Sequence, residues 1–461
     1  MAALLQITDL SKSFNTTLFS DVNLNVQGTT KIGLIGDNGS GKSSLLKILA
    51  GLDSASEGKV YWNKESKVGY LEQEITTDTF EVSGGEKKIL KLTELFYGDY
   101  NVLLLDEPDN HLDLDHKDWF ENLVKEYEGI VIVISHDRKF LENSVDKVWY
   151  LDEGKVKEYP FNYSKFKDVY ESDMKSRTHL WETQEKERLR LKDIIAAMRI
   201  KANSNDKFAG RYHSAEKKYI KFVSEMTEKP PAEKKVHMSV VLEKQHKTKT
   251  ALYLKNIFKS YGDLNILNDL SLHLACGQKI AITAPNGSGK STLLNIIVGI
   301  TKADSGEVYI GPGLKIGYYA QEHLEALDPN ATMIEEIQKA VPMHHYDAMA
   351  YLKKFLFTPN QIKLEVRFLS GGQKSRLQLA KFLATNPDIL VLDEPTNHLD
   401  LKTVLALENF LINYEGTLIL VSHDQELVEN VTDTIYSLTL PSNSGPSATA
   451  SSLVALSIPS R

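Results

Sequence analysis

The pattern of apolar and polar positions predicts two α/β halves separated by a long polar helix. Short apolar runs such as 130–134 and 417–421 have the length of buried parallel strands, which carry few polar residues because both faces are covered. Residues 161–209 contain neither Gly nor Pro, and their sparse apolar residues recur at three- and four-residue spacing. This segment predicts a helix of about forty residues, on the order of 60 Å long if unbroken.

The long helix is expected to lead into a second, shorter one. The polar stretch Asn203 to Tyr212, which contains Gly210, predicts a turn. The second helix is expected to begin at Ser214 and to end before Pro230 and Pro231. Together the two helices predict an antiparallel helical hairpin.

The far part of this hairpin is basic, although the whole chain carries a net charge of -8. Its basic residues are Lys186, Arg188, Arg190, Lys192, Arg199, Lys201, Lys207, Arg211, Lys217, Lys218 and Lys221. Phe208, Tyr212 and His213 lie near the predicted tip, where aromatic rings could stack on bases. A solvated helical face is the plain alternative, and the contrast with an acidic chain favours contact with nucleic acid.

Five segments occur twice in the same order, which identifies an internal repeat. The pairs are GDNGSGKSSLLKILAGL and APNGSGKSTLLNIIVGI, KVGYLEQE and KIGYYAQE, VSGGEKK and LSGGQKS, LLLDEPDNHLDL and LVLDEPTNHLDL, and VIVISHD and LILVSHD. The first two pairs are 248 positions apart and the last three are 287 apart, so the second copy carries 39 additional residues between them. Within this insertion, 331–363 shows helical spacing, whereas the corresponding interval of the first copy, 74–82, is too short for a helical subdomain.

Each copy has a glycine-rich loop between an apolar run and a helical segment, the context of a phosphate-binding loop. The two loops comprise Gly36, Asp37, Asn38, Gly39, Ser40, Gly41, Lys42, Ser43 and Ser44, and Ala284, Pro285, Asn286, Gly287, Ser288, Gly289, Lys290, Ser291 and Thr292. Backbone N–H groups and the helix N-terminus favour phosphate there. Lys42 and Lys290 are expected to reach the phosphates of ATP, and Ser43 and Ser291 to ligate Mg²⁺. Ala284 replaces the first glycine, which indicates either slight strain or a position that needs no special backbone freedom.

Acidic residues follow a further apolar run in each copy. Asp106 and Asp393 are suited to holding Mg²⁺, and the adjacent Glu107 and Glu394 to orienting and polarising the attacking water. His136 and His423 follow the next apolar runs, where an imidazole could contact the γ-phosphate or hold the water.

Composition limits the class of protein. A single cysteine, Cys276, excludes an internal disulfide framework and fits a reducing compartment. No run reaches the roughly 18 to 20 apolar residues that span a bilayer, and the first residues lack the pattern of a signal peptide. We therefore expect a cytoplasmic protein.

The combined motifs resemble the ATP-binding cassette superfamily, and the tandem cassettes with a charged linker resemble its ABC-F group. The resemblance implies an α/β fold of two P-loop NTPase domains joined by a helical hairpin. The expected order is a first cassette at 1–160 with almost no helical subdomain, a charged hairpin linker at 161–248, a second cassette at 249–440, and a disordered tail at 441–461.

The resemblance also implies site residues and a head-to-tail sandwich with an ATP between each phosphate loop and the opposite signature loop. The signature residues would be Ser83, Gly84, Gly85, Glu86, Ser370, Gly371, Gly372 and Gln373. Gln73 and Gln321 would contact Mg²⁺ and water, Phe14 and Tyr261 would stack on adenine, and Asp113 and Asp400 would act across the interface. Asp109 stands where the second copy has Thr396, and because no catalytic group is lost we expect two competent sites.

The function implied is a monomeric ATPase that places its hairpin against ribosomal RNA and tRNA. The short first cassette favours the members that protect ribosomes from antibiotics. The alternatives are a housekeeping translation factor, a DNA-binding ATPase and, least favoured, the ATPase subunit of a transporter. No integral membrane partner is expected, because the first cassette lacks the helical insert that usually contacts one and the hairpin would have no role there. A lone cysteine excludes the zinc-containing DNA-repair cassettes.

Overall fold

The computed structural model describes residues 4–14, 17–73, 84–110, 112–202, 206–226, 250–262, 264–285, 287–320, 327–355, 357–369, 371–396, 399–438 and 453–456. The chain divides into two compact units, Met1–Asn162 with Val236–Arg461, and Tyr163–Lys235. Among the described residues, no helix combines the length and the apolar character needed to cross a membrane.

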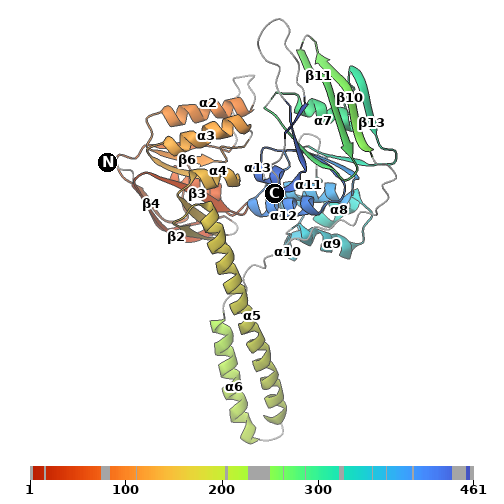
Figure 1. The fold of residues 1–461 in the computed structure, drawn as a ribbon. Helices are drawn as coiled ribbons and strands as arrows, with labels where there is room; N and C mark the ends of the chain where they lie inside the picture. The colour runs from red at the N-terminus through yellow and green to blue at the C-terminus, as the bar shows by residue number, and fades with distance from the viewer. Residues whose placement is uncertain are drawn as a thin grey trace. The chain divides into compact units, whose positions relative to one another are not determined.

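The first α/β domain is built on a six-stranded sheet (Figure 1). Its order is β5 (Val68–Leu71), β6 (Val102–Asp106), β7 (Ile130–Ile134), β3 (Thr30–Gly36), β8 (Lys147–Asp152) and β9 (Lys155–Tyr159). The strands run parallel except for β9, which pairs antiparallel with β8. All residues of β6 and β7 are buried, as expected of central strands that are covered on both faces.

The described residues of this domain also form a small antiparallel sheet and several helices. The antiparallel sheet has the order β2 (Thr17–Gln27), β1 (Leu4–Ser13) and β4 (Glu57–Trp62). The helices are α1 (Lys42–Leu49), α2 (Gly84–Tyr97), α3 (Leu114–Glu126) and α4 (Arg138–Ser144).

The second α/β domain repeats this plan. Its large sheet has the order β14 (Ile316–Tyr319), β15 (Ile389–Asp393), β16 (Thr417–Val421), β12 (Lys279–Thr283), β17 (Thr434–Leu438) and β18 (Leu453–Leu456). Its small sheet has the order β11 (Leu264–Ala275), β10 (Thr250–Tyr261) and β13 (Ser305–Ile310). The equal strand order confirms two tandem domains of one fold.

The second domain contains the additional helices that the sequence predicts at 331–363. They are α8 (Met333–Ala340), α9 (His345–Lys354) and α10 (Pro359–Ile362). Both α8 and α10 begin with a capping box, from Thr332 and Thr358, which satisfies the first free N–H groups of each helix. The corresponding interval of the first copy, 74–82, lies outside the described residues.

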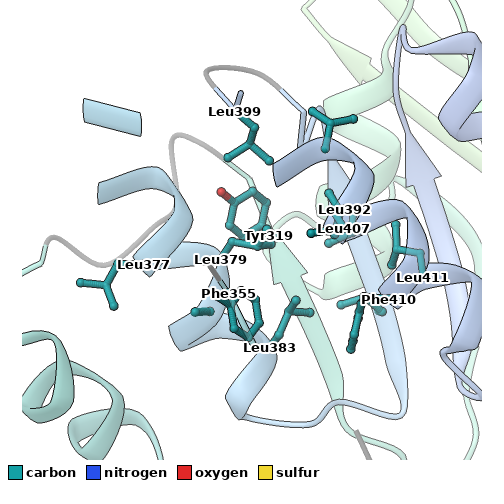
Figure 2. Packing of buried hydrophobic residues seen from close by; sticks show 14 of the residues in the cluster. Tyr319, Phe355, Leu377, Leu379, Leu383, Leu392, Leu399, Leu407, Phe410 and Leu411 are labelled. Atoms are coloured by element: carbon teal, nitrogen blue, oxygen red, sulfur yellow. The ribbon is translucent and has the colours of Figure 1, made fainter. Parts of the chain in front are cut away.

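The described residues of this domain also form α7 (Lys290–Val298), η2 (Val366–Phe368), α11 (Gly371–Ala384), α12 (Leu401–Asn413) and α13 (Gln425–Val431). Apolar residues of α9, α11 and α12 form one core with β14 and β15 (Figure 2). Tyr319, Phe355, Leu383 and Leu392 lie together in this core. It holds α11, which carries the second signature segment at its start, against the sheet.

The tail prediction is wrong at 453–456. These residues form β18 and pair antiparallel with β17, as β9 pairs with β8. A strand edge offers unpaired N–H and C=O groups, and a short apolar segment supplies the matching backbone even in a polar context. The rest of the predicted tail lies outside the described residues.

The described residues of the separate unit form two helices, α5 (Tyr163–Ala202) and α6 (Asp206–Glu225). The forty-residue helix is as expected, but α6 begins eight residues before the predicted start at Ser214. The predicted turn at 203–212 is therefore too long, because a helix tolerates one glycine such as Gly210 at a cost of about 1 kcal/mol. Arg188 of α5 donates to the Tyr219 hydroxyl of α6 at 3.4 Å, which joins the two helices.

Candidate functional site

The first glycine-rich loop connects β3 to α1, and its lysine folds back onto the loop. Lys42 Nζ donates to the carbonyl oxygens of Gly36 at 2.7 Å and Asp37 at 3.0 Å. Gly41 has a φ of 107°, a conformation that a residue with a β-carbon rarely adopts. Burial lowers the pKa of Lys42, and the nearby carboxylate of Glu107 opposes that shift.

The second loop has the same arrangement between β12 and α7. Lys290 Nζ donates to the carbonyls of Ala284 at 2.6 Å and Pro285 at 3.3 Å, and Gly289 has a φ of 95°. The helices begin at the lysines, so Ser43, Ser44, Ser291 and Thr292 lie in their first turns. Asn286 lies outside the described residues. Neither Gly36 nor Ala284 has a positive φ, which explains why alanine is accepted in the second loop.

Gly36 is required for space rather than for backbone freedom. A β-carbon at this position would overlap with the carbonyl oxygen of Leu151 in the neighbouring strand. We expect Gly36→Ala to lower the free energy of unfolding by about 1–3 kcal/mol, the usual cost of overpacking. The reverse change in the other copy, Ala284→Gly, should cost less than about 1 kcal/mol. Urea unfolding checks both variants, and equal effects would contradict this steric explanation.

The two glutamates that follow β6 and β15 have an unusual backbone conformation. Glu107 has a φ of 49° and Glu394 a φ of 46°, in the left-handed region that side chains with a β-carbon disfavour. Such strain persists only where the surroundings enforce it, and it concentrates at functional sites. Both peptides are fixed, because Glu107 N–H donates to Ile134 O at 3.0 Å and Glu394 N–H to Val421 O at 2.9 Å.

In the first domain, Glu107 is held by side chains of its own cassette. Its Oε2 accepts from Gln73 Nε2 at 2.8 Å and from Asn110 Nδ2 at 2.6 Å. Its carbonyl oxygen accepts from Lys88 Nζ at 2.6 Å, and His136 Nε2 lies 3.8 Å from its Oε1. Burial, together with the neighbouring Asp106 charge, raises the pKa of Glu107.

In the second domain, Glu394 is held by His423. The His423 N–H donates to Glu394 Oε2 at 3.3 Å, and the imidazole Nε2 lies 3.4 Å from Oε1 and 3.3 Å from Lys290 Nζ. Burial raises the pKa of Glu394 to about 7. Burial and the nearby lysines lower the pKa of both His136 and His423 to about 3, so the two imidazoles are neutral at pH 7.

The oxygen atoms beside the first lysine fit a hard divalent cation. Asp106 Oδ1 is buried without a hydrogen-bond partner among the described residues, and the Ser43 hydroxyl hydrogen-bonds to this carboxylate. Carboxylate and hydroxyl oxygens are ligands that Mg²⁺ accepts, usually in combination with substrate phosphates. In the described part of the chain, no group of three or more His, Cys, Asp and Glu residues is placed to hold a metal ion.

The first loop faces residues of the second domain. The Asn38 N–H donates to Asp400 Oδ2 at 3.4 Å, and Lys402 Nζ pairs with Asp37 at 3.0 Å. Gly372 of α11 packs so closely that a β-carbon there would collide with the Asn38 side chain. Gly371 and Gln373 lie in the same helical turn, and Ser370 lies outside the described residues.

The second loop is approached by the first domain in a related way. Burial lowers the pKa of Lys290. The carboxylates of Glu394 and Asp393 in its own domain oppose that shift, and so does Asp113, which belongs to the first domain. Asp113 is the N-cap of α3, and Lys117 in the first turn of that helix donates to the His423 carbonyl at 3.3 Å. Gly84, Gly85 and Glu86 begin α2, whereas Ser83 and Gln321 lie outside the described residues.

Phe14 and Tyr261 lie at the ends of β1 and β10 with exposed rings. Their exposed fractions are 67% and 53%, and the ammonium of Lys12 or Lys259 lies 4.8 or 5.3 Å from the respective ring centre. Exposed aromatic faces beside a cation could accept an adenine, and their stacking role stays a prediction.

Asp109, which replaces the threonine of the second copy, is a buried carboxylate. Ser135 Oγ donates to its Oδ2 at 3.0 Å, while Oδ1 has no hydrogen-bond partner in the described part of the chain. Burial, and then the nearby Asp137, raise the pKa of Asp109 from 3.8 to about 6.

Because the folded protein holds the proton of Asp109 more tightly than the unfolded chain, ionisation costs stability as pH rises through this range. Relative to wild type, we expect Asp109→Asn to gain about 1 kcal/mol in free energy of unfolding between pH 5 and pH 8. Urea unfolding at the two pH values measures this gain. A difference that is the same at both would contradict the raised pKa.

Sequence reasoning missed three cations, Lys88, Lys117 and Arg138. The positions 287 residues later hold Ser375, Val404 and Gln425, so a comparison of the two copies shows unmatched charges. None of the three was singled out from the sequence, yet Lys88 and Arg138 are buried and Lys117 is largely so.

Comparisons with known proteins agree with this geometry. A family model described as ABC transporter matches residues 19–76 and 267–397, and a second with the same description matches 149–239. The ATP-binding protein Uup of Buchnera aphidicola subsp. Acyrthosiphon pisum is 31% identical over 93% of this chain and 79% of that protein. The ribosome protection protein VmlR of Bacillus subtilis is 32% identical over 94% of this chain and 86% of that protein.

A solved structure of the archaeal ribosome recycling factor aABCE1 in complex with a ribosomal stalk protein has a TM-score of 0.65. It is 18% identical and the match covers 98% of this chain and 90% of that one, which shows the shared fold. The duplicated loops, the repeated sheet order and the similarity to these proteins all indicate the same family. The chain belongs to the ATP-binding cassette family, and its relatives are ABC-F type proteins.

Proposed function

We propose that the protein hydrolyses ATP at two composite sites between its cassettes. The observation that carries this proposal is the duplicated cluster of lysine, glutamate and histidine, in which each glutamate has a left-handed backbone. Glu107 and Glu394 orient and polarise the attacking water. Lys42 and Lys290 bind the phosphates, and the neutral imidazoles of His136 and His423 stay close to the glutamates.

Mg²⁺ would be held at these sites by oxygen atoms of both the protein and ATP. Its protein ligands would be Ser43, Gln73 and Asp106 in the first cassette and Ser291, Gln321 and Asp393 in the second. When bound, the cation neutralises charge on the phosphates. The chain's own residues hold the water and exclude solvent around it.

We infer that the partner is the cytoplasmic ribosome, contacted by the hairpin through ribosomal RNA and tRNA. Exposed basic residues on α5 and α6 support this inference: Lys186, Arg190, Lys192, Arg199, Arg211, Lys217, Lys218 and Lys221. Contacts between lysine or arginine side chains and phosphates provide affinity for RNA that does not depend on its sequence. The relative VmlR is named a ribosome protection protein, and the short interval of the first cassette favours the same antibiotic-protection role here.

Sedimentation of ribosomes through a sucrose cushion tests this function. The variant Glu107→Gln with Glu394→Gln should bind ATP without completing hydrolysis and should co-sediment with ribosomes when ATP is present. Wild type should co-sediment much less, because hydrolysis releases it. Adding Lys217→Gln and Lys218→Gln to this hydrolysis-deficient variant should abolish co-sedimentation at about 150 mM salt while ATP binding is retained.

If ATP binds but no variant sediments with ribosomes, the ribosome inference fails. Retention on DNA would then favour a DNA-binding ATPase, and co-purification with an integral membrane protein would favour a transporter subunit. If sedimentation succeeds, displacement of ribosome-bound antibiotics separates a protection protein from a housekeeping translation factor.

A further inference from the structure

One lysine of the first cassette crosses to the catalytic cluster of the second. Lys117 lies in the first turn of α3, and its Nζ donates to Asp137 Oδ2 at 2.7 Å and to the His423 carbonyl at 3.3 Å. The exposed fractions of the Lys117 and Asp137 side chains are 20% and 14%. A charge-assisted hydrogen bond that is largely shielded from water is strong, so it holds the Lys117 side chain in a defined position.

The residue that Lys117 contacts is the one that holds Glu394. The N–H of His423 donates to Glu394 Oε2 at 3.3 Å, and its imidazole lies 3.4 Å from Oε1. The backbone of His423 is therefore bound at its N–H by the glutamate and at its carbonyl by Lys117. Withdrawal of the first cassette would remove one of these two restraints.

Among the described residues, no cation of the second cassette lies at the His136 carbonyl in the way that Lys117 lies at the His423 carbonyl. The position 287 residues after Lys117 is Val404, a buried hydrocarbon that cannot donate to the His136 carbonyl. Glu107 is held instead from within its own cassette, by Gln73, Asn110 and, at its backbone, Lys88. The two sites therefore differ in whether the other cassette helps to hold the glutamate cluster.

We propose that Lys117 is a positioning residue of the second catalytic site, which makes hydrolysis there depend on contact between the cassettes. The proposal rests on the ATP hydrolysis proposed above. Lys117 touches neither the water nor the phosphates, and it acts by fixing the peptide of His423 and, through it, the carboxylate of Glu394. It follows that the two sites are not equivalent.

The test measures steady-state ATP turnover in the Glu107→Gln background, where only the second site works. We expect Lys117→Met to lower kcat at least tenfold while KM changes less than about twofold, because the phosphate contacts remain. Lys117→Arg, which keeps the charge and the donors, should restore most of the rate. Lys139→Met is the matched control, because it removes a hydrogen bond across the cassettes (2.6 Å to Gln425) without touching His423, and it should leave kcat within twofold.

The same substitution in the Glu394→Gln background distinguishes positioning from general damage. There the loss should be at least five times smaller, because Val404 occupies the corresponding place at the first site. Lys117→Met also removes the cation that pairs with Asp137, which still caps α4 by accepting from Phe140 N–H. A variant that adds Asp137→Asn removes the uncompensated charge, and its kcat should stay as low as that of Lys117→Met if positioning of His423 is the cause.

Equal losses in the two backgrounds, or no loss in the Glu107→Gln background, would overturn the role of Lys117. Absence of ATP turnover in wild type would instead overturn the proposed hydrolysis.

Discussion

ATP turnover should fall about 10³-fold when Glu107 and Glu394 are both changed to Gln, within the usual contribution of a general base. The amide keeps the size of the side chain and can retain the strained backbone, but it cannot accept a proton from water. ATP affinity should remain within a few-fold of wild type, because Lys42 and Lys290 keep their loop geometry. Phosphate release and nucleotide binding, measured on the same preparation, check the two halves of this prediction.

Glu153→Gln is the matched control for the change to amide. Glu153 also has a left-handed backbone, with a φ of 48°, and its side chain is exposed at the turn between β8 and β9. Its replacement should leave turnover within twofold of wild type. The proposed role of the two glutamates is wrong if the double variant keeps more than a tenth of the wild-type rate.

Replacement of Arg138 by Met should lower the free energy of unfolding by about 3–5 kcal/mol, the cost of removing one partner from buried ion pairs. Arg138, only 4% exposed, lies on α4 of the first cassette and contacts three carboxylates of the second. Its guanidinium lies 2.9 Å from Glu408, 2.9 Å from Glu426 and 3.5 Å from Asp424. Without the cation these carboxylates repel one another while partly buried.

Urea unfolding measures the loss. A double-mutant cycle of Arg138→Met with Glu408→Gln gives the interaction energy of the Arg138–Glu408 pair. Lys139→Met provides the comparison at the rim of the same interface, because its partner Gln425 is neutral and Lys139 is exposed, so its cost should stay below about 1 kcal/mol. If Arg138→Met and Lys139→Met cost the same, Arg138 does not anchor the interface.

The sequence predicts the parts of the fold that depend on local pattern and repetition. Apolar runs mark β6, β7, β15 and β16, and the segment without Gly and Pro, 161–209, contains the whole of α5. The helical insertion at 331–363 follows from the unequal spacing of the repeated segments. Gly210 shows the limit of local reasoning, because one unfavourable residue does not end a helix that packs against a neighbour.

The strand at Leu453–Leu456 shows a second limit. Its segment stands in a Ser-, Ala- and Pro-rich context, which predicts disorder, yet the open edge of β17 pairs with it. The stability of such a strand depends on its pairing with another strand of the chain, so the sequence of the segment alone does not predict it.

By itself, the sequence determined the two α/β halves, the hairpin and the identity of the loop lysines, glutamates and histidines. Those features follow from residue spacing over a few turns or strands. Only the tertiary structure decided that Lys117, Arg138 and Lys88 are interior cations. Lys117 meets His423, 306 positions away, and a contact over that distance imposes no periodicity on either segment. The left-handed backbones of Glu107 and Glu394 likewise become visible only in three dimensions, because surrounding contacts rather than local preference maintain them.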